Sequence, residues 1–288
     1  VVIPAKNEED FISKVITTLP NFVDRIVVID DGSSDMTAQI VNKHSTELKN
    51  LEMIQLPGNG VGSAIDAGHQ AMLKSLSEPF VSVVMAGDGQ MDPDDLELLI
   101  EPVTKNQADY VKGNRFLHQD GLGNMPLVRK IASMVLGFFT TLAAGRHVTD
   151  PQCGYTATSS LVLRHWNWSK SWKGYGYPNY WLIELSRRSM RVAEVPVKSI
   201  YGKEKSGIIM AKFFLSVGLM MLIMHHKRCF SMLFSKSVAP HTILSFIAYI
   251  LGWITIIPGV STDLENELTA GFASKLILLL FCWVCAHI

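Results

Sequence analysis

Three apolar runs in the first third of the chain each end at a polar loop, and a helical pattern follows each loop. The runs cover residues 1–4, 26–29 and 80–85. A continuous apolar run is typical of a strand that is buried on both faces, as in a parallel sheet. The repeated order of strand, polar loop and helix therefore predicts an α/β protein with a mostly parallel sheet and helices on both faces.

The loops behind these runs carry carboxylates. The polar clusters in these loops are Asn7-Glu8-Glu9, Asp30-Asp31, and Asp88 with Gln90 and Asp92. Each cluster alone could be a solvated turn, but ligands of an open α/β sheet bind at the carboxyl ends of its strands. Carboxylates that converge there repel one another unless a cation or a polar ligand balances them. A divalent cation with oxygen ligands, together with the phosphates of a nucleotide, would provide that balance.

Two turns carry further local signals. Asp92-Pro93 predicts the start of a helix, with aspartate as N-cap and proline at the first helical position. After an expected strand over residues 51–56, the chain reads Pro-Gly-Asn-Gly-Val-Gly-Ser-Ala. This glycine spacing does not fit G-x-G-x-x-G and so argues against a dehydrogenase. It indicates a turn whose backbone closely approaches a ligand.

Composition excludes some partners. The net charge is zero, so no overall positive field attracts nucleic acid. Hydrophobic residues make up 48% of the chain and charged residues 18%, and the apolar excess lies after about Lys205. The four cysteines are too few and too scattered for a disulfide framework, which favours a reduced, cytoplasm-facing protein.

The last third of the chain predicts membrane association. Residues 208–224 are almost wholly apolar and precede a His-His-Lys-Arg sequence, which suits a helix lying in the membrane interface. Segments 243–258 and 272–288 are apolar enough to predict two transmembrane helices, with buried core helices as the alternative. Lysine and arginine gather before the first span, so the preceding domain is predicted to face the cytoplasm.

The chain is therefore divided into three predicted parts. They are an α/β domain over 1–207, an interfacial helical region over 208–236 and transmembrane helices within 243–288. The chain begins inside an expected strand and ends inside an apolar run, so both ends look truncated and the number of spans stays open. An aromatic-rich stretch over 166–181 is expected either in the core or near the membrane interface.

These motifs resemble the family 2 glycosyltransferases with the GT-A nucleotide-sugar fold, in the branch of the polyprenyl- and dolichol-phosphate mannose synthases. The matching sequences are Val2-Ile3-Pro4-Ala5-Lys6-Asn7-Glu8-Glu9, Val28-Ile29-Asp30-Asp31-Gly32-Ser33-Ser34-Asp35-Met36-Thr37, Ala86-Gly87-Asp88-Gly89-Gln90-Met91-Asp92-Pro93, Gly113-Asn114-Arg115, Asp150-Pro151-Gln152-Cys153-Gly154-Tyr155 and Gly202-Lys203-Glu204-Lys205. The resemblance covers about residues 1–210. It implies an inverting enzyme that moves a hexose of the mannose or glucose type from a GDP- or UDP-sugar to a polyprenyl phosphate.

The resemblance also implies which residues bind the donor, the cation and the acceptor. The nucleotide sugar would lie against Pro4, Ala5, Asn7, Glu8, Asp30, Asp31 and Asp88, Mg²⁺ or Mn²⁺ against Asp88 and Gln90, and the acceptor phosphate or donor diphosphate against Arg115, Arg129 and Lys205. Asp88, Asp150 and Arg115 would take part in catalysis. The family usually has D-x-D-x-Q at the metal motif, but Ala86 stands here in place of the first aspartate, so one metal ligand is missing.

The acceptor follows from the chemistry of the nucleophile. A sugar hydroxyl needs a general base, whereas a phosphate monoester, with its second pKa near ~6, is already anionic at pH 7. Asp150 is the only nearby candidate base after Asp92, and it could equally be a turn residue before Pro151. A lipid phosphate is therefore favoured. The alternatives are a hydroxyl acceptor in a glycolipid or polysaccharide and a non-catalytic nucleotide-sugar-binding membrane protein.

The expected location is a plasma or inner membrane, or the endoplasmic reticulum in a eukaryote, with the α/β domain on the cytoplasmic side. The sequence predicts no nucleic-acid partner, and it leaves the oligomeric state, the sugar, the nucleotide base and the lipid chain length open.

Overall fold

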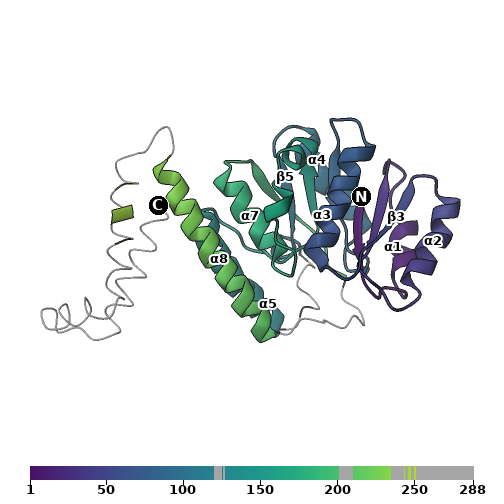
Figure 1. The fold of residues 1–288 in the computed structure, drawn as a ribbon, viewed down its shortest axis with the longest axis horizontal. Coiled ribbons are helices and arrows are strands. Elements are labelled where there is room, and N and C mark those ends of the chain that lie inside the picture. The colour runs from purple at the N-terminus through teal and green to yellow at the C-terminus, as the bar shows by residue number, and fades with distance from the viewer. Residues whose placement is uncertain are drawn as a thin grey trace, which may run out of the picture.

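The computed structural model describes residues 1–119, 125, 127–200 and 210–234, with residues 243, 246, 247 and 250 beyond them. These residues form a layered α/β structure with a long helix at the end opposite the N-terminus (Figure 1). The strands are β1 (Val2–Ala5), β2 (Ile26–Asp30), β3 (Leu51–Gln55), β4 (Val81–Val84), β5 (Tyr110–Asn114), β6 (Thr156–Ser159) and β7 (Val192–Pro196). The helices are α1 (Ile12–Thr17), α2 (Thr37–Glu47), α3 (Val61–Ser75), α4 (Leu96–Thr104), α5 (Leu127–Ala144), α6 (Ser160–Arg164), α7 (Tyr177–Arg187) and α8 (Met210–Leu233), with short 3₁₀ turns η1 (Pro93–Asp95), η2 (Arg115–Leu117) and η3 (Trp168–Lys170).

The strands form one sheet in the order β3-β2-β1-β4-β6-β5-β7. The expected mostly parallel sheet is confirmed, since only β6 runs antiparallel, to both β4 and β5. Strand β6 was not predicted from the sequence, because Thr-Ala-Thr-Ser is short and contains no apolar run.

Helices cover both faces of the sheet because successive strand residues point to opposite sides. Ile3 and Val28 belong to the core that includes residues of α1, α2 and α4. Val2 and Val27 face the other way and pack with α3. A third cluster of buried residues joins strands β4 and β5 to helices α5, α7 and α8. The helix predicted to start at Asp92-Pro93 begins there as η1, and the Asp92 side chain accepts a hydrogen bond from the Asp94 N–H.

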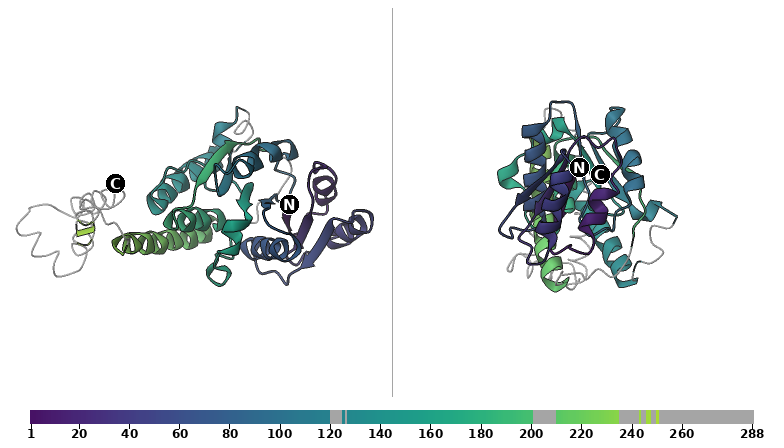
Figure 2. Two further views of the ribbon diagram at one scale, coloured as in Figure 1. Left: turned by 90° about the horizontal axis from the view of Figure 1, so that it is seen from above. Right: turned by 90° about the vertical axis from the view of Figure 1, so that its right-hand side faces the viewer.

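Helices α5 and α8 lie together at the end of the molecule opposite α1 and α2 (Figures 1 and 2). Arg228 on α8 donates from Nε to the carbonyl of Ala143, 2.9 Å away, in the last turn of α5. Val217 on α8 is fully buried and packs against Gly176, just before α7. A Cβ at Gly176 would lie only 2.6 Å from the Val217 side chain. The helix expected over 208–224 therefore packs one side against α5 and α7. The predicted boundaries at 207 and 236 stay predictions.

The aromatic-rich stretch is mostly core. Trp166 and Trp181 stack with ring centroids 3.8 Å apart, and Tyr177 and Tyr180 are buried beside them. Tyr175 is the exposed exception, at 53%. Packing rather than a membrane interface explains these buried rings.

No helix among the described residues is both long enough and apolar enough to cross a membrane. The two expected spans, 243–258 and 272–288, lie almost entirely outside the described residues.

Candidate functional site

The acidic loops meet at one edge of the sheet. Strand β1 pairs in parallel with β2 on one side, with Ala5 beside Asp30, and with β4 on the other, with Val2 beside Val84. The loops that begin after these three strands therefore lie next to one another. Strand β5 is antiparallel to β6, as β4 is, so Arg115 follows β5 at the same edge as Asp88.

The loops after β1 and β2 are held together by reciprocal hydrogen bonds. The Asn7 N–H donates to Ser33 Oγ, 2.9 Å away, and the Ser34 N–H donates back to Asn7 Oδ1 over 2.8 Å. Similarly, the Glu8 N–H donates to Thr37 Oγ1, 2.8 Å away. Asn7 has a backbone φ of 57°, in the left-handed region that residues other than glycine, asparagine and aspartate rarely adopt. The two loops thus form one preorganised wall at the expected nucleoside position.

We expect Asn7→Ala to weaken donor-nucleotide binding and to destabilise the protein by about 1 kcal/mol more than Asn7→Gly. Both substitutions remove the acceptor for the Ser34 N–H, but glycine tolerates the positive φ. Chemical denaturation measures the stability difference, and calorimetric titration with UDP or GDP measures binding.

Asn106 provides the matched control, because it also has a positive φ, 55°, but follows α4 away from these loops. Asn106→Ala should lower stability to a similar extent and leave nucleotide affinity unchanged. Equal affinities for the Asn7 variants and wild type would contradict the role of Asn7 in this wall.

Asp30 and Asp31 are buried and accept hydrogen bonds from backbone N–H groups. The Ser33 N–H donates to Asp30 Oδ1 over 3.0 Å. The N–H groups of Asn59 and Gly60 donate to the two oxygens of Asp31 over 2.7 and 2.8 Å. Any contact of Asp31 with a nucleoside therefore comes from a carboxylate that the glycine turn already holds in place.

The glycine turn packs closely against another segment of the chain. A Cβ on Gly60 would lie 2.7 Å from the Lys173 carbonyl oxygen, and one on Gly62 would lie 2.2 Å from the Trp172 carbonyl oxygen. The Gly62 N–H donates to the same Lys173 oxygen over 2.9 Å. At Gly60 and Gly62 the close backbone approach is therefore to the chain's own residues 172–173. The approach of this turn to a ligand stays a prediction.

The loop after β4 is joined to the chain that leaves β7. The Gln90 N–H donates to Asp88 Oδ1 over 3.0 Å, and the Gln90 carbonyl accepts from the Ile200 N–H over 2.9 Å. Met91 forms an isolated antiparallel bridge with Ser199. This pairing could not be predicted from the sequence, because it joins residues more than a hundred positions apart with no periodic pattern. Lys205 lies beyond Ile200, outside the described residues.

The donor set of this loop suits a cation that is shared with phosphates. Within the described parts of the chain, no group of three histidine, cysteine, aspartate or glutamate side chains is placed to hold a metal ion. Asp92 already caps η1 and lies with Oδ2 3.7 Å from Lys198 Nζ. One carboxylate and one amide, Asp88 and Gln90, fit Mg²⁺ or Mn²⁺, since such ions often bind through one or two carboxylates plus substrate phosphates.

Asp150 and Arg115 form a bidentate pair. Asp150 is fully buried, and its Oδ2 accepts from the Arg115 backbone N–H and Nε while Oδ1 accepts from a terminal guanidinium nitrogen, all over 2.8–3.0 Å. Burial acts to raise the pKa of the Asp150 carboxyl, but the hydrogen bonds and charge of Arg115 hold that pKa below its usual range. A carboxylate held in this way is a poor general base and a good support for the guanidinium.

Lys112 lies behind this pair and was not anticipated. Its side chain has no exposed surface, and Nζ donates to the Cys153 carbonyl oxygen. Burial lowers the pKa of Lys112, while Asp150 is among the groups that oppose this shift. The sequence shows Lys112 only as a polar residue of the strand, because its burial depends on Cys153, 41 residues later. For Arg129, the backbone is described within α5 but the side chain is not.

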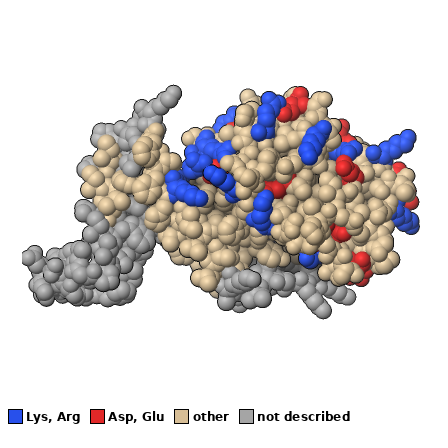
Figure 3. Space-filling model, in the orientation of Figure 1, with Lys and Arg blue, Asp and Glu red and all other residues tan. Residues whose placement is uncertain are grey.

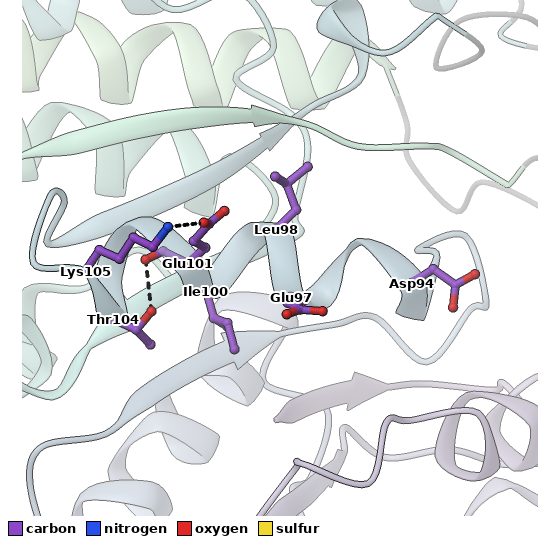
Figure 4. Close-up of a pocket in the computed structure, with 7 residues that line it drawn as sticks. All are labelled: Asp94, Glu97, Leu98, Ile100, Glu101, Thr104 and Lys105. Atoms are coloured by element: carbon purple, nitrogen blue, oxygen red, sulfur yellow. Dashed lines mark hydrogen bonds and ion pairs between the residues drawn. The ribbon is translucent and has the colours of Figure 1, made fainter.

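A hollow on α4 does not belong to this edge. It is lined by residues of η1 and α4 and by the residue that follows α4: Asp94, Glu97, Leu98, Ile100, Glu101, Thr104 and Lys105 (Figure 4). Lys105 forms an ion pair with Glu101, one turn earlier. Three carboxylates would repel a diphosphate, so this face is a solvated helix surface.

Comparison with solved structures shows the fold. Glucosyl-3-phosphoglycerate synthase from Mycobacterium tuberculosis, in a complex with Mn²⁺, UDP and phosphoglyceric acid, matches with a TM-score of 0.57 at 20% identity, over 77% of this chain and 76% of that one. The same enzyme with Mn²⁺, UDP-glucose and phosphoglyceric acid matches with a TM-score of 0.58. The chain therefore has the GT-A fold expected from its motifs.

Comparison with known sequences shows the family. The model of glycosyl transferase family 2 matches residues 1–166. The UDP-N-acetylglucosamine–dolichyl-phosphate N-acetylglucosaminyltransferase of Methanococcus voltae is 31% identical over 215 residues, covering 70% of this chain and 85% of that protein. The dolichyl-phosphate β-glucosyltransferase ALG5C of Trichomonas vaginalis is 28% identical, over 68% of this chain and 62% of its own length. Together with the acidic edge built by β1, β2 and β4, these matches show that the chain is a glycosyltransferase of family 2.

Proposed function

We propose that this enzyme transfers a sugar from a nucleotide sugar to the phosphate of a polyprenyl lipid. The observation that carries the proposal is the shared edge of the sheet, with the Asp88 carboxylate after β4 and the Arg115 guanidinium after β5. The similarity to dolichyl-phosphate transferases over two thirds or more of the chain supports it. These relatives use N-acetylglucosamine or glucose, so we favour a UDP-linked sugar of the glucose type over GDP-mannose.

The proposed reaction needs no general base. An oxygen of the lipid phosphate, held by Arg115, attacks the anomeric carbon, and a new carbon–oxygen bond forms there as the bond to the donor diphosphate breaks. The nucleoside diphosphate leaves with the electron pair, and in-line attack inverts the anomeric centre. Asp88 and Gln90 would hold Mg²⁺ or Mn²⁺, which supplies positive charge to the leaving diphosphate. Asp150 keeps the Arg115 guanidinium fixed.

The test is transfer itself. Membranes containing the full chain are incubated with a panel of labelled nucleotide sugars and a polyprenyl phosphate, and the lipid phase is extracted. Label from a UDP-sugar is expected in an acid-labile lipid phosphate. If no donor labels the lipid phase, the proposed function fails.

We further propose that α5 and α8 lie on the cytoplasmic surface of the membrane that holds the acceptor. Both helices expose large apolar side chains at spacings of three, four or seven residues: Leu127, Ile131, Met134, Val135, Phe138 and Phe139 on α5, and Leu215, Leu219, Ile223 and Phe230 on α8. Figure 3 shows a mostly uncharged surface over the side of α8 that it presents, with lysine and arginine gathered over the neighbouring α7. Lys227 is the exposed charged residue between Ile223 and Phe230, and its long side chain can reach the lipid headgroups. Exposed apolar side chains that recur along two neighbouring helices are typical of an interaction surface, and α8 precedes the apolar segments expected to span the bilayer.

Phe138→Glu is expected to raise KM for polyprenyl phosphate in phospholipid vesicles by about tenfold, because an exposed phenylalanine that enters a bilayer contributes about 1.5–3 kcal/mol. KM for the nucleotide sugar should not change. Phe22→Glu is the control, since Phe22 is 48% exposed and Phe138 59%, but Phe22 follows α1 at the other end of the molecule. Equal KM values for the two variants would contradict membrane docking through this face.

A further inference from the structure

Asp66 is a buried carboxylate that the proposed reaction does not use. It lies on α3 with 2% of its surface exposed. Ser171 Oγ donates to Asp66 Oδ1 over 3.0 Å, and Lys173 Nζ donates to Oδ2 over 2.6 Å. Tyr177 Oη lies 3.4 Å from Oδ1. Burial raises the pKa of Asp66, and Lys173 opposes that shift, so the ammonium is the group that balances this carboxylate.

The three partners all lie in residues 171–177, which run from the end of η3 to the first residue of α7. One carboxylate therefore fixes this segment against α3 at three points. The segment is otherwise held at its tip by a hydrogen bond from Trp172 Nε1 to the Tyr175 carbonyl, 2.7 Å away. Tyr175 is 53% exposed, so the tip lies at the surface.

Residues 171–177 also contact the start of α3, directly after the glycine turn. The Lys173 carbonyl accepts from the Gly62 and Ser63 N–H groups over 2.9 and 3.3 Å. These N–H groups lie in the first turn of α3 and need an acceptor, because no side chain caps this helix. Lys173 thus contacts α3 twice, with its ammonium at Asp66 and with its backbone at the helix start.

The glycine turn also forms hydrogen bonds with Asp31 at the acidic edge of the sheet. Asn59 and Gly60 donate their N–H groups to Asp31, and a Cβ on Gly58 would lie 3.5 Å from Lys6 Nζ in the loop after β1. A continuous series of contacts therefore runs from Asp66 through Lys173 and the turn to Asp31. It ends at the nucleoside side of the edge, whereas Asp88 and Gln90 lie on the diphosphate side.

We propose that Asp66 and Lys173 are positioning residues for the nucleoside half of the donor. They fix residues 171–177 behind the glycine turn, and the turn fixes Asp31. This assignment rests on the proposed function, because it requires a nucleoside diphosphate at this edge. The nucleoside half and the diphosphate half of the donor site are then positioned by different residues. Substitution of Asp66 or Lys173 should therefore weaken binding of the nucleoside and leave binding of the diphosphate unchanged.

The test compares two probes on the full-length protein. Lys173→Met keeps the backbone carbonyl and most of the side-chain volume but removes the ammonium from Asp66. We expect about fivefold weaker binding of UDP in the presence of Mn²⁺, a modest factor because Lys173 is half exposed. Binding of inorganic pyrophosphate with Mn²⁺ should stay within about twofold of wild type. Asp66→Asn should act in the same direction, and the two changes combined should be less than additive.

Lys170→Met is the matched control, because Lys170 is exposed in the same connection and has no ion pair with the described residues. It should bind both probes like wild type. Unchanged UDP affinity in Lys173→Met overturns the positioning role and leaves the proposed function standing. Equal losses for UDP and pyrophosphate also overturn it, since they indicate general damage. If wild type binds neither UDP nor GDP, the proposed function and this inference fall together.

Discussion

Replacing Asp88 by asparagine is expected to lower kcat/KM for sugar transfer by at least about a hundredfold. Asp88 follows β4 directly, where the loops from β1 and β2 also converge, and its Oδ1 is oriented by the Gln90 N–H. Ala86 stands where the family usually has another carboxylate, so the charge of Asp88 has no neighbour in the motif to replace it. The steady-state rate of lipid labelling at saturating Mn²⁺ measures the effect.

Asp94→Asn is the control for Asp88→Asn, because Asp94 is an exposed carboxylate in the η1 turn that follows the same loop. It should transfer sugar at nearly the wild-type rate. If Asp88→Asn does so as well, Asp88 does not serve the diphosphate, and the assignment of the edge fails.

Ala86→Asp provides the opposite change. A second carboxylate at this position should tighten Mn²⁺ binding in the presence of UDP by about tenfold, the factor that corresponds to about 1.4 kcal/mol of added attraction. Titration of Mn²⁺ followed by electron paramagnetic resonance measures this without relying on turnover. An unchanged Mn²⁺ affinity would show that residue 86 does not face the cation.

The strands that carry the acidic loops could be predicted from local pattern. The run Ile-Val-Val-Ile before Asp30 is continuous and apolar, and it forms β2 within one residue of the expected bounds. The same reasoning located Asp88 after β4 and the helix start at Asp92. These features depend on residues that are neighbours in sequence, so periodicity and capping are sufficient to find them.

The supports behind the site could not be predicted in this way. Lys112, Asp66 and the Gln90–Ile200 contact each depend on a partner 41 to 111 positions away. A single sequence shows each only as an ordinary polar residue. Strand β6 could not be predicted for a related reason. Its alternating threonines form a strand because they pair with β4 on one side and β5 on the other, not because they are apolar.

Replacing Asp150 by asparagine is expected to raise KM for the lipid phosphate by about tenfold or more and to leave the shape of the pH–kcat profile unchanged. The carboxylate accepts three hydrogen bonds from Arg115, and an amide, which has one acceptor oxygen and two donor hydrogens, cannot reproduce them. The guanidinium would therefore lose its fixed direction. Initial rates at varied acceptor concentration and pH measure both quantities.

Asp109 offers an unusually close control. Its Oδ2 accepts from the backbone N–H and Nε of Arg191 and its Oδ1 from a terminal nitrogen, the same pattern that joins Asp150 to Arg115. This pair lies before β5, at the opposite end of that strand from Arg115, and Arg191 is half exposed. Asp109→Asn should leave both KM values unchanged.

The two interpretations of Asp150 also differ in their pH dependence. Its pKa in the folded protein is below the usual value, so the stability it contributes is complete at neutral pH and is lost as the pH falls through the acidic range. The unfolding free energies of wild type and Asp150→Asn should therefore differ most near pH 7, by up to about 3–5 kcal/mol, and converge on acidification. If Asp150 were the base for a hydroxyl acceptor, Asp150→Asn would instead abolish kcat at every acceptor concentration. If Asp150→Asn keeps kcat and raises only KM for the acceptor, Asp150 is not a general base, and the lipid phosphate attacks without one.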